Sequence, residues 1–264
     1  MGMNMISDAA LTQEVGRLLA VLYDKRFGAL KKLSLARLLN KNPYLYRALG
    51  ISDSSEFIMQ LMIAFVSSSD ETIFGNDFFE PLAIFAARQG NQHEDADRRV
   101  TVGAGAGQDI AIETANSYLA ISVKSGKNIF NSQSTKGQAA EFTALTSRLR
   151  KLNKELRAII GYGYGRKRQV KASNVEKIAG QAFWQLLTGE QDFYLRLSAA
   201  MADFSGEHGT AYKAAFEQKH QQCLREFMIH YVDEQGVILW EKTVAFNSAE
   251  VKPKAPQRIK KSQA

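Results

Sequence analysis

The stretch GQDIAIETANSYLAISVKSG, residues 107–126, decides the fold that we expect, because it has the pattern of a β-hairpin. Strand-forming residues fill IAI (110–112) and YLAISV (118–123), and the TANS between them has the composition of a turn. A turn centred near residues 115 and 116 gives antiparallel pairs whose numbers add up to about 231–233. On this register Asp109 lies opposite residues 122–124, and its carboxylate can meet the amine of Lys124.

A carboxylate beside a lysine is an arrangement that can serve the hydrolysis of a phosphodiester. Carboxylate oxygens suit Mg²⁺, which stabilises developing negative charge and lowers the pKa of a bound water, while lysine acts as a compact positive charge. The alternative is an ordinary cross-strand ion pair between Asp109 and Lys124 on a solvated face. Taken alone, the hairpin leaves both interpretations open.

The segments before the hairpin predict helices. Apolar residues recur at helical spacing over 11–27 and 30–40, and Asp53 with Glu56 resembles a capping box that opens a helix over 56–66. A further helix covers part of 76–89 and starts or bends near Pro81. The Gly-rich, charged segment 90–108 predicts a loop that leads into the hairpin.

After the hairpin, the pattern alternates again between helix and strand. We expect helices within 138–156, 174–188, 190–204 and 210–232, and strands within 157–165 and 236–246. These elements predict an α/β core, a mixed sheet flanked by helices, with helical N- and C-terminal additions. The expected division is a helical region over 1–70, a core with C-terminal helices over 71–248, and a basic, disordered tail over 249–264.

Charge and cysteine content limit the classes of protein to which the chain can belong. The chain of 264 residues has a formal net charge of +7, but KPKAPQRIKKSQA at its end carries five of the basic residues and no acid. The body is therefore only mildly basic, and binding to nucleic acid must be argued from local clusters. Cys223 is the single cysteine, which excludes an internal disulfide and fits a reducing cytoplasm. No export signal or membrane span is expected.

A dense basic cluster follows the hairpin. Between residues 148 and 171, Glu155 is the single acid among nine basic residues: Arg148, Arg150, Lys151, Lys154, Arg157, Arg166, Lys167, Arg168 and Lys171. Such a density suits a surface that follows DNA phosphates. The alternative is a well-solvated helix face and a polar loop.

Two neighbouring segments are candidates for closer DNA contacts. The polar loop after the hairpin has amides and a lysine suited to base edges, at Lys127, Asn128, Asn131 and Gln133. The GYGYGRKR segment adds Tyr162, Tyr164, Arg166, Lys167 and Arg168, and its glycines can let the backbone approach a ligand closely. The same segment lacks the GK[ST] ending of a nucleotide-binding loop, so no nucleotide cofactor is expected. The four histidines show no ligand spacing.

The D…SVK hairpin resembles the core of the PD-(D/E)xK nuclease superfamily, in which an Asp on one strand is followed by an acid-x-Lys triplet on the next. More narrowly, five blocks in order are similar to the PmeII family of type II restriction endonucleases. They are KKLSLARLLNKNPYLYRALGI, IFGNDFFEPLAIF, GQDIAIE, ISVKSGKNIFNSQS and GQAFWQLLTGEQDFY. The resemblance covers roughly residues 26–195, and it favours the catalytic interpretation of the hairpin over the ion pair.

The resemblance implies roles for individual residues. Asp109 becomes the metal-binding acid and Lys124 the catalytic lysine. Glu80 becomes the acid that many superfamily members supply from the helix before the hairpin, although it could also be a surface acid that caps this helix. Asp77 is the substitute if the helix is rotated.

The chain departs from the superfamily pattern at Ser122, which stands where a carboxylate is expected. A hydroxyl cannot supply the anionic oxygen that Mg²⁺ prefers, so another acid must complete the site. We rank Glu80 first, Glu141 on the following helix second, and Glu113 third. Glu113 shares a face with Asp109 but lies about 13–14 Å along the strand.

The implied function is a Mg²⁺-dependent type II restriction endonuclease that cuts double-stranded DNA and works as a homodimer, because a two-fold symmetric protein most simply cuts both strands of a symmetric site. One alternative is a protein with a nuclease-like fold that has lost activity and only binds DNA. Another is a structure-selective nuclease of DNA repair.

Overall fold

A computed structural model of the chain describes residues 5–90, 97–105, 108–125, 137, 140–145, 147, 154–166 and 175–250. It forms two compact units, each built from segments that are distant in the sequence. The first unit is Met1–Leu30 with Ser67–Ala215, and the second is Lys31–Val66 with Phe216–Ala264. These bounds differ from the linear division at residues 70 and 248 that the sequence suggests. Most of the expected tail lies outside the described residues.

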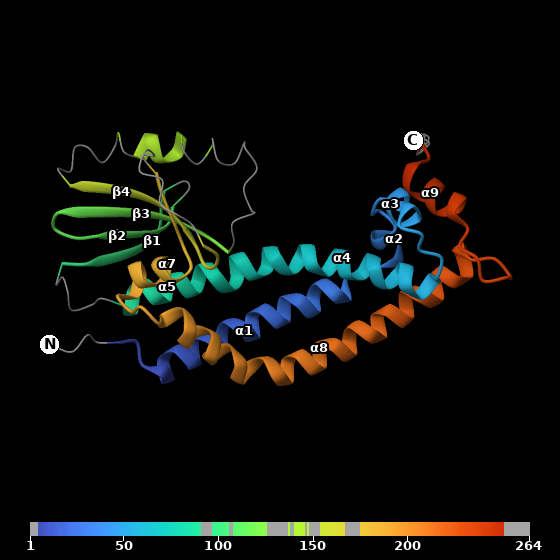
Figure 1. The fold of residues 1–264 in the computed structure, drawn as a ribbon, viewed down its shortest axis with the longest axis horizontal. Coiled ribbons are helices and arrows are strands. Elements are labelled where there is room, and N and C mark those ends of the chain that lie inside the picture. The colour runs from blue at the N-terminus through green and yellow to red at the C-terminus, as the bar shows by residue number, and fades with distance from the viewer. Residues whose placement is uncertain are drawn as a thin grey trace, which may run out of the picture. The chain divides into compact units, whose positions relative to one another are not determined.

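The first unit contains a five-stranded mixed sheet in the order β1-β2-β3-β4-β5 (Figure 1). The antiparallel strands β1, β2 and β3 are joined to β4 and β5, which run parallel to β3. The bounds are Arg99–Gly105 (β1), Gln108–Glu113 (β2), Ser117–Lys124 (β3), Glu155–Tyr162 (β4) and Val175–Ala179 (β5).

Strands β2 and β3 form the expected hairpin. Ala111 pairs with Ala120, which lies within the register that the turn position predicts. The turn is closed by the N–H of Thr114, which donates to the Ser117 carbonyl at 2.9 Å, and by the two hydroxyls of these residues at 2.8 Å from each other. The side-chain bonds of threonine and serine therefore fix the register from the turn outward.

One face of the sheet packs on a large apolar cluster. Ile110, Ile112 and Ile121 contribute to it from the hairpin. It is covered by helices α1 (Asp8–Lys31), α5 (Glu80–Gln89) and α7 (Gln181–Thr188) and by the first part of α8 (Phe193–Tyr231). Helices α5 and α7 lie beneath the sheet in Figure 1.

The other face of the sheet packs on a second apolar cluster, in which three alanines lie among larger residues such as Tyr118, Ile160 and Tyr162. Ala111, Ala120 and Ala158 pack there beneath Phe142 and Leu145, which belong to a helical segment over 140–145. The helix expected in this region is thus present in the part that the structure describes. Asp109 and Lys124 share this face with Ala111 and Ala120, because side chains two positions apart in a strand point the same way.

Three expected elements are wrong. Strand β1 replaces part of the loop expected over 90–108, and β5 replaces the start of the helix expected over 174–188. The late strand expected over 236–246 is mostly helix α9 (Trp240–Ser248), and Ile238 makes only an isolated bridge to Val232. The β-forming residues of this segment pack as a helix because tertiary contacts override local preference.

A long helical stretch runs from Ser54 to Gln89 without interruption. Helix α4 (Ser54–Phe74) starts at the expected cap, where the Asp53 carboxylate accepts from the Glu56 N–H at 2.7 Å. It continues through a π-helical turn, η1 (Gly75–Phe79), into α5. Pro81 lies two residues after the end of the π turn. Since proline lacks an N–H and crowds the carbonyl four residues earlier, the wider turn accommodates it where an α-helix would break.

This stretch is long and apolar enough, by length and composition alone, to cross a membrane. A core helix of a soluble protein passes the same test, so the property is weak evidence. Near the end of α4, Asp70 makes two hydrogen bonds of 2.9 and 2.8 Å with the guanidinium of Arg26, so this part of the stretch packs against α1.

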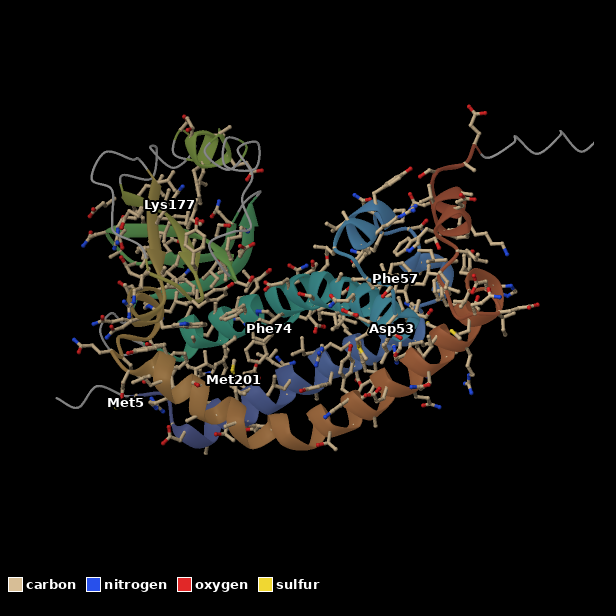
Figure 2. All side chains as sticks on the ribbon, turned by 45° about the vertical axis from the view of Figure 1, so that its right-hand side comes forward. Met5, Asp53, Phe57, Phe74, Lys177 and Met201 are labelled. Carbon is tan, nitrogen blue, oxygen red and sulfur yellow. The ribbon has the colours of Figure 1, made fainter. Side chains whose placement is uncertain are left out.

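The second unit is helical in the part of the chain that the structure describes. It combines α2 (Leu35–Leu38), α3 (Pro43–Ala48) and α9 with the beginning of α4 and the end of α8. Phe57 lies at its centre, with ring centroids 5.6 Å from Tyr46, 5.3 Å from Phe227 and 5.2 Å from Trp240. Figure 2 labels Phe57 on α4.

Candidate active site

Asp109 and Lys124 meet at the open end of the hairpin. The Lys124 Nζ lies 3.9 Å from the Asp109 Oδ2, and the two side chains keep 26% and 23% of their surface exposed. Regular pairing between β2 and β3 extends to Ile110 and Ile121. Beyond that pair, the Asp109 carboxylate takes the place of a backbone partner and accepts the Val123 N–H at 2.6 Å. The acid is therefore fixed to the neighbouring strand.

The contacts of Asp109 leave one of its oxygens open. The Val123 N–H, the Ser122 hydroxyl at 3.3 Å and the Lys124 amine all approach Oδ2. Oδ1 has no partner among the described residues. A carboxylate that is oriented through one oxygen and open at the other is suited to hold a cation.

Lys124 is fixed by the central strand of the sheet. It pairs with Tyr162 of β4, and its carbonyl accepts the N–H of Gly163 at 2.9 Å. Two neighbouring strands therefore hold the backbone at Lys124, and only the flexible part of the side chain extends to Asp109. Because of this support, the lysine loses little conformational freedom when its amine binds an anion.

Glu80 supplies a second carboxylate from the start of α5. Partial burial raises its pKa above the ordinary value of 4.5, the negative charge of Asp109 raises it further, and the positive charge of Lys124 opposes the shift. The acid therefore lies close enough to interact with both hairpin residues. Two carboxylates that repel each other beside a lysine form a site in which a bound divalent cation would relieve the repulsion.

The π turn determines which acids of this helix face the hairpin. The Glu80 N–H donates to the Gly75 carbonyl, five residues earlier, so the turn is widened just before the acid. Asp77 within the turn is already engaged, since its carboxylate binds the Lys25 amine of α1 at 2.5 Å. Glu80 is therefore the acid of this helix that interacts with Asp109 and Lys124. Asp77 is instead paired with Lys25.

The other expected ligands are placed differently. Glu113 binds the Lys154 amine at 2.7 Å at the turn end of the hairpin, away from Asp109. Glu141 is exposed on the segment over 140–145, and it is not among the charges that shift the pKa of Glu80. Within the described ranges, no three acidic, histidine or cysteine side chains gather as a metal cluster. Two carboxylates still suit Mg²⁺, which often keeps several waters and binds substrate phosphate.

Ser122 is buried in the sheet with 1% of its surface exposed. Its hydroxyl donates to Asp109, so the residue that replaces the expected acid helps to orient the acid that remains. Ser125, which sequence reasoning did not single out, is also buried, and its hydroxyl has no partner among the described residues. Gly75 of the π turn lies against it, since a Cβ at position 75 would be 3.5 Å from the Ser125 Oγ.

The expected DNA contacts divide into three groups. Lys127, Asn128, Asn131, Gln133, Lys167 and Arg168 lie outside the described residues. Tyr164 and Arg166 are exposed, Tyr164 with 52% of its surface. Tyr162 does not fit the expected role, because its side chain is 1% exposed and packs in the second apolar cluster with Phe142 and Ala120.

Part of the basic cluster is used inside the fold. Lys154 pairs with Glu113, and the Arg157 guanidinium makes two 2.8 Å hydrogen bonds with Glu176 of β5. This pairing lowers the pKa of Glu176 below its ordinary value. Lys154 and Arg157 therefore form ion pairs within the fold. The positive surface is smaller than the number of basic residues in the sequence suggests.

The glycines of GYGYG also have an internal role. A Cβ at Gly161 would lie 2.1 Å from the ring of Phe183, and one at Gly163 would lie 2.3 Å from the ring of Phe79. These positions need glycine because aromatic rings pack against the backbone there. These glycines therefore let core side chains approach the backbone at the end of β4, whereas the sequence led us to expect the approach of a ligand.

A five-stranded mixed sheet flanked by helices, with an acid and a lysine at the open end of its hairpin, has the α/β restriction-endonuclease-like fold with helical additions. The chain belongs to the family described as type II restriction endonuclease EcoO109I, whose family model matches residues 9–208. The match includes Glu80, Asp109, Lys124 and Glu141. It supports the restriction endonuclease class and not the PmeII family in particular. No curated protein matches the chain.

Proposed function

We propose that the chain is a Mg²⁺-dependent type II restriction endonuclease that hydrolyses phosphodiester bonds in double-stranded DNA at a specific short sequence. Membership of the restriction endonuclease family supports DNA as the substrate and hydrolysis as the reaction. The observation that carries the catalytic assignment is the meeting of Asp109 and Lys124, 3.9 Å apart, beside the carboxylate of Glu80.

Asp109 and Glu80 are the residues that would hold the metal. A bound Mg²⁺ would supply positive charge to the phosphate and lower the pKa of a water. Asp109 is oriented for this by the Val123 N–H, which fixes Oδ2 and leaves Oδ1 open to the site. Partial burial is the main cause of the raised pKa of Glu80, and the negative charge of Asp109 adds to it, so a cation held by both acids would offset both effects.

Lys124 places a positive charge at the phosphate. Its amine can donate to a phosphate oxygen or to the attacking water, and it stabilises the negative charge that grows as water attacks phosphorus. In the overall reaction, a phosphorus–oxygen bond to water forms, the bond to the leaving oxygen breaks, and that oxygen takes up a proton. Ser122 contributes by donating to Asp109 and keeping its orientation.

We further propose that the protein acts as a homodimer. A two-fold symmetric DNA site presents the same geometry on both strands, and a two-fold dimer matches it with one active site per strand. Arg166 and Tyr164, exposed beyond the end of β4, are the described residues that we expect to contact DNA.

The test is digestion of a sequenced plasmid by the purified protein with Mg²⁺ and with a chelator in its place. Discrete fragments that form only with Mg²⁺ support the proposal, and their ends give the recognised sequence. Binding without cutting would instead support a nuclease-like DNA-binding protein, since Ser122 stands where an acid is expected. Cutting restricted to branched or damaged DNA would support a structure-selective nuclease.

A further inference from the structure

A cavity of about 690 Å³ lies beside the candidate active site in the first unit. Its walls include the aromatic rings of Phe74, Phe79, Tyr164, Trp184 and Tyr194. Phe74 at the end of α4 and Met201 on α8, both labelled in Figure 2, also line it. This volume falls in the range of about 300–1,000 Å³ that is usual for pockets that hold small ligands.

The cavity adjoins the catalytic candidates through the chain itself. Phe79 in its wall directly precedes Glu80. Gly163, another wall residue, donates its N–H to the carbonyl of Lys124 at 2.9 Å. The cavity and the catalytic pair therefore share the end of the sheet at which β3 and β4 finish.

Two aromatic rings of the cavity, those of Tyr164 and Tyr194, are exposed enough to stack on an occupant, whereas Phe79 and Trp184 keep only 6% and 1% of their surface exposed and form part of the apolar wall. Tyr164 exposes 52% and Tyr194 37% of its surface, although large aromatic side chains are usually buried more deeply. The rings of Phe79 and Trp184 are nearly parallel, at 27°, with centroids 6.1 Å apart. The Trp184 indole N–H donates to the Gly163 carbonyl at 2.9 Å, which fixes this buried ring in the wall. Aromatic faces stack on nucleobases of any sequence.

Polar groups at the same cavity suit the edge of a base. Arg166, Gln181 and Ser198 line it and carry hydrogen-bond donors and acceptors. The Arg166 charge also complements the phosphate of the nucleotide that carries the base. A purely apolar occupant would make no use of this charge, so the lining favours a nucleotide.

Hydrogen bonds tie the backbone around the cavity together. Gly180 has a φ of +58°, donates its N–H to the Tyr162 carbonyl at 3.0 Å, and accepts from the N–H groups of Phe183 and Trp184. A Cβ at Gly180 would lie 2.7 Å from the Gly165 carbonyl oxygen, so the two loops that form the wall are in contact. A cavity that is formed before binding lowers the cost of ordering an occupant.

We propose that this cavity receives one nucleobase turned out of the duplex beside the scissile phosphate. The inference rests on the proposed function, because it requires DNA at Asp109 and Lys124. Turning a base out costs its pairing and stacking, and this cost is smallest when the base is already mispaired. The protein should therefore bind most tightly to a duplex in which that one base has no proper partner.

The test begins with the recognised sequence from the plasmid digestion. A set of duplexes then carries this sequence with one mispair at each position in turn, and binding is measured with a chelator present so that no strand is cut. We expect one position, or its symmetric pair, at which a mispair tightens binding by about 10-fold. Ser198→Phe fills the cavity from an exposed position on α8 and should reduce this preference to within about twofold.

The matched control is Ala199→Phe, which adds the same ring at the neighbouring exposed position that does not line the cavity. It should keep the wild-type preference. Equal binding of every mispaired duplex by the wild type, or an unchanged preference in Ser198→Phe, would overturn the inference while plasmid cleavage still supports the proposed function. A much lower melting temperature for Ser198→Phe than for Ala199→Phe would also overturn it, because the protein's own chain would then already fill the cavity.

Discussion

The two ends of the β2–β3 hairpin each carry an acid beside a lysine, and they differ in how the pair is held. At the turn end, Lys154 binds Glu113 at 2.7 Å and also donates to the Thr114 carbonyl at 2.8 Å. At the open end, Lys124 stands 3.9 Å from Asp109, whose nearer oxygen is taken by the Val123 N–H. The first pair is closed by short contacts, whereas the second is longer and leaves the Oδ1 of Asp109 without a partner among the described residues.

This difference separates a structural ion pair from a site. The turn-end lysine gains two oxygen partners and closes a connection between strands. At the open end, Glu80 adds a second carboxyl group. Partial burial and the negative charge of Asp109 raise its pKa. A charged pair with an additional unpaired acid costs stability in the free protein, and such arrangements are typical of functional sites.

The largest expected effect separates the two acids of the hairpin. Asp109→Ala should lower the rate of plasmid cleavage by about 10³-fold or more, because it removes a proposed metal ligand. Glu113→Ala, on the same face of the same strand, should cleave within about threefold of wild type, since it only breaks a part-buried ion pair at the turn end of the hairpin. Single-turnover cleavage of the two variants measures the contrast, and equal losses would remove the distinction.

The two lysines should differ in the same direction. Lys124→Ala should reduce cleavage by about 10²–10³-fold, the usual effect of losing one group that stabilises developing charge. Lys154→Ala should leave the cleavage rate nearly unchanged. DNA binding by Lys124→Ala, measured by a mobility shift, should stay close to wild type. Wild-type turnover by this variant would show that the amine has no part in the reaction.

The charged form of Glu80 should lower the stability of the folded protein, because partial burial and the negative charge of Asp109 disfavour it. Because its pKa is raised in the folded state, its contribution to stability is fully present below the unfolded pKa and is lost as pH rises through the folded pKa. Glu80→Gln should therefore raise the melting temperature at pH 7 without divalent metal, by about 1–3 °C, with less gain near pH 4. Glu113→Gln should give no such gain.

The same variant sharpens the metal assignment. Mg²⁺ should raise the melting temperature of the wild type, because it binds the folded site and relieves the repulsion between the acids. This rise should be smaller in Glu80→Gln and unchanged in Glu113→Gln. An equal rise in all three proteins would place the metal elsewhere.

The smallest effect is expected at Ser122. Ser122→Ala removes one 3.3 Å hydrogen bond to Asp109 and leaves the shorter bond from Val123. Cleavage should fall by about 10-fold, because a hydrogen bond to a charged group contributes about 1.5–3 kcal/mol and this one is long, at 3.3 Å. A loss as large as that of Lys124→Ala would give the hydroxyl a direct part in the reaction.

The hairpin and its register could be predicted from the sequence because both depend on local signals. Alternating apolar residues define the two strands, and the threonine and serine of the turn set their pairing. Since Asp109 and Lys124 lie on these strands, their meeting follows from the register alone. The restriction endonuclease class followed from residues around them.

Other features depend on contacts that one sequence does not display. The π turn that presents Glu80 arises where Pro81 meets a helix already fixed by Asp70 and Arg26. Strand β5 has only five residues, too few for a recognisable strand pattern in the sequence, and it forms by pairing with β4. The burial of Tyr162 could have been foreseen, because alternation along β4 puts it on the same face as Ile160.

The most direct test of the central claim is a calorimetric titration of Mg²⁺ into the wild type, Asp109→Ala and Glu113→Ala. We expect the wild type and Glu113→Ala to bind the ion with similar affinity and Asp109→Ala to lose this binding. Retained affinity in Asp109→Ala, or its loss in Glu113→Ala, would contradict the assignment of the open end of the hairpin as the metal site.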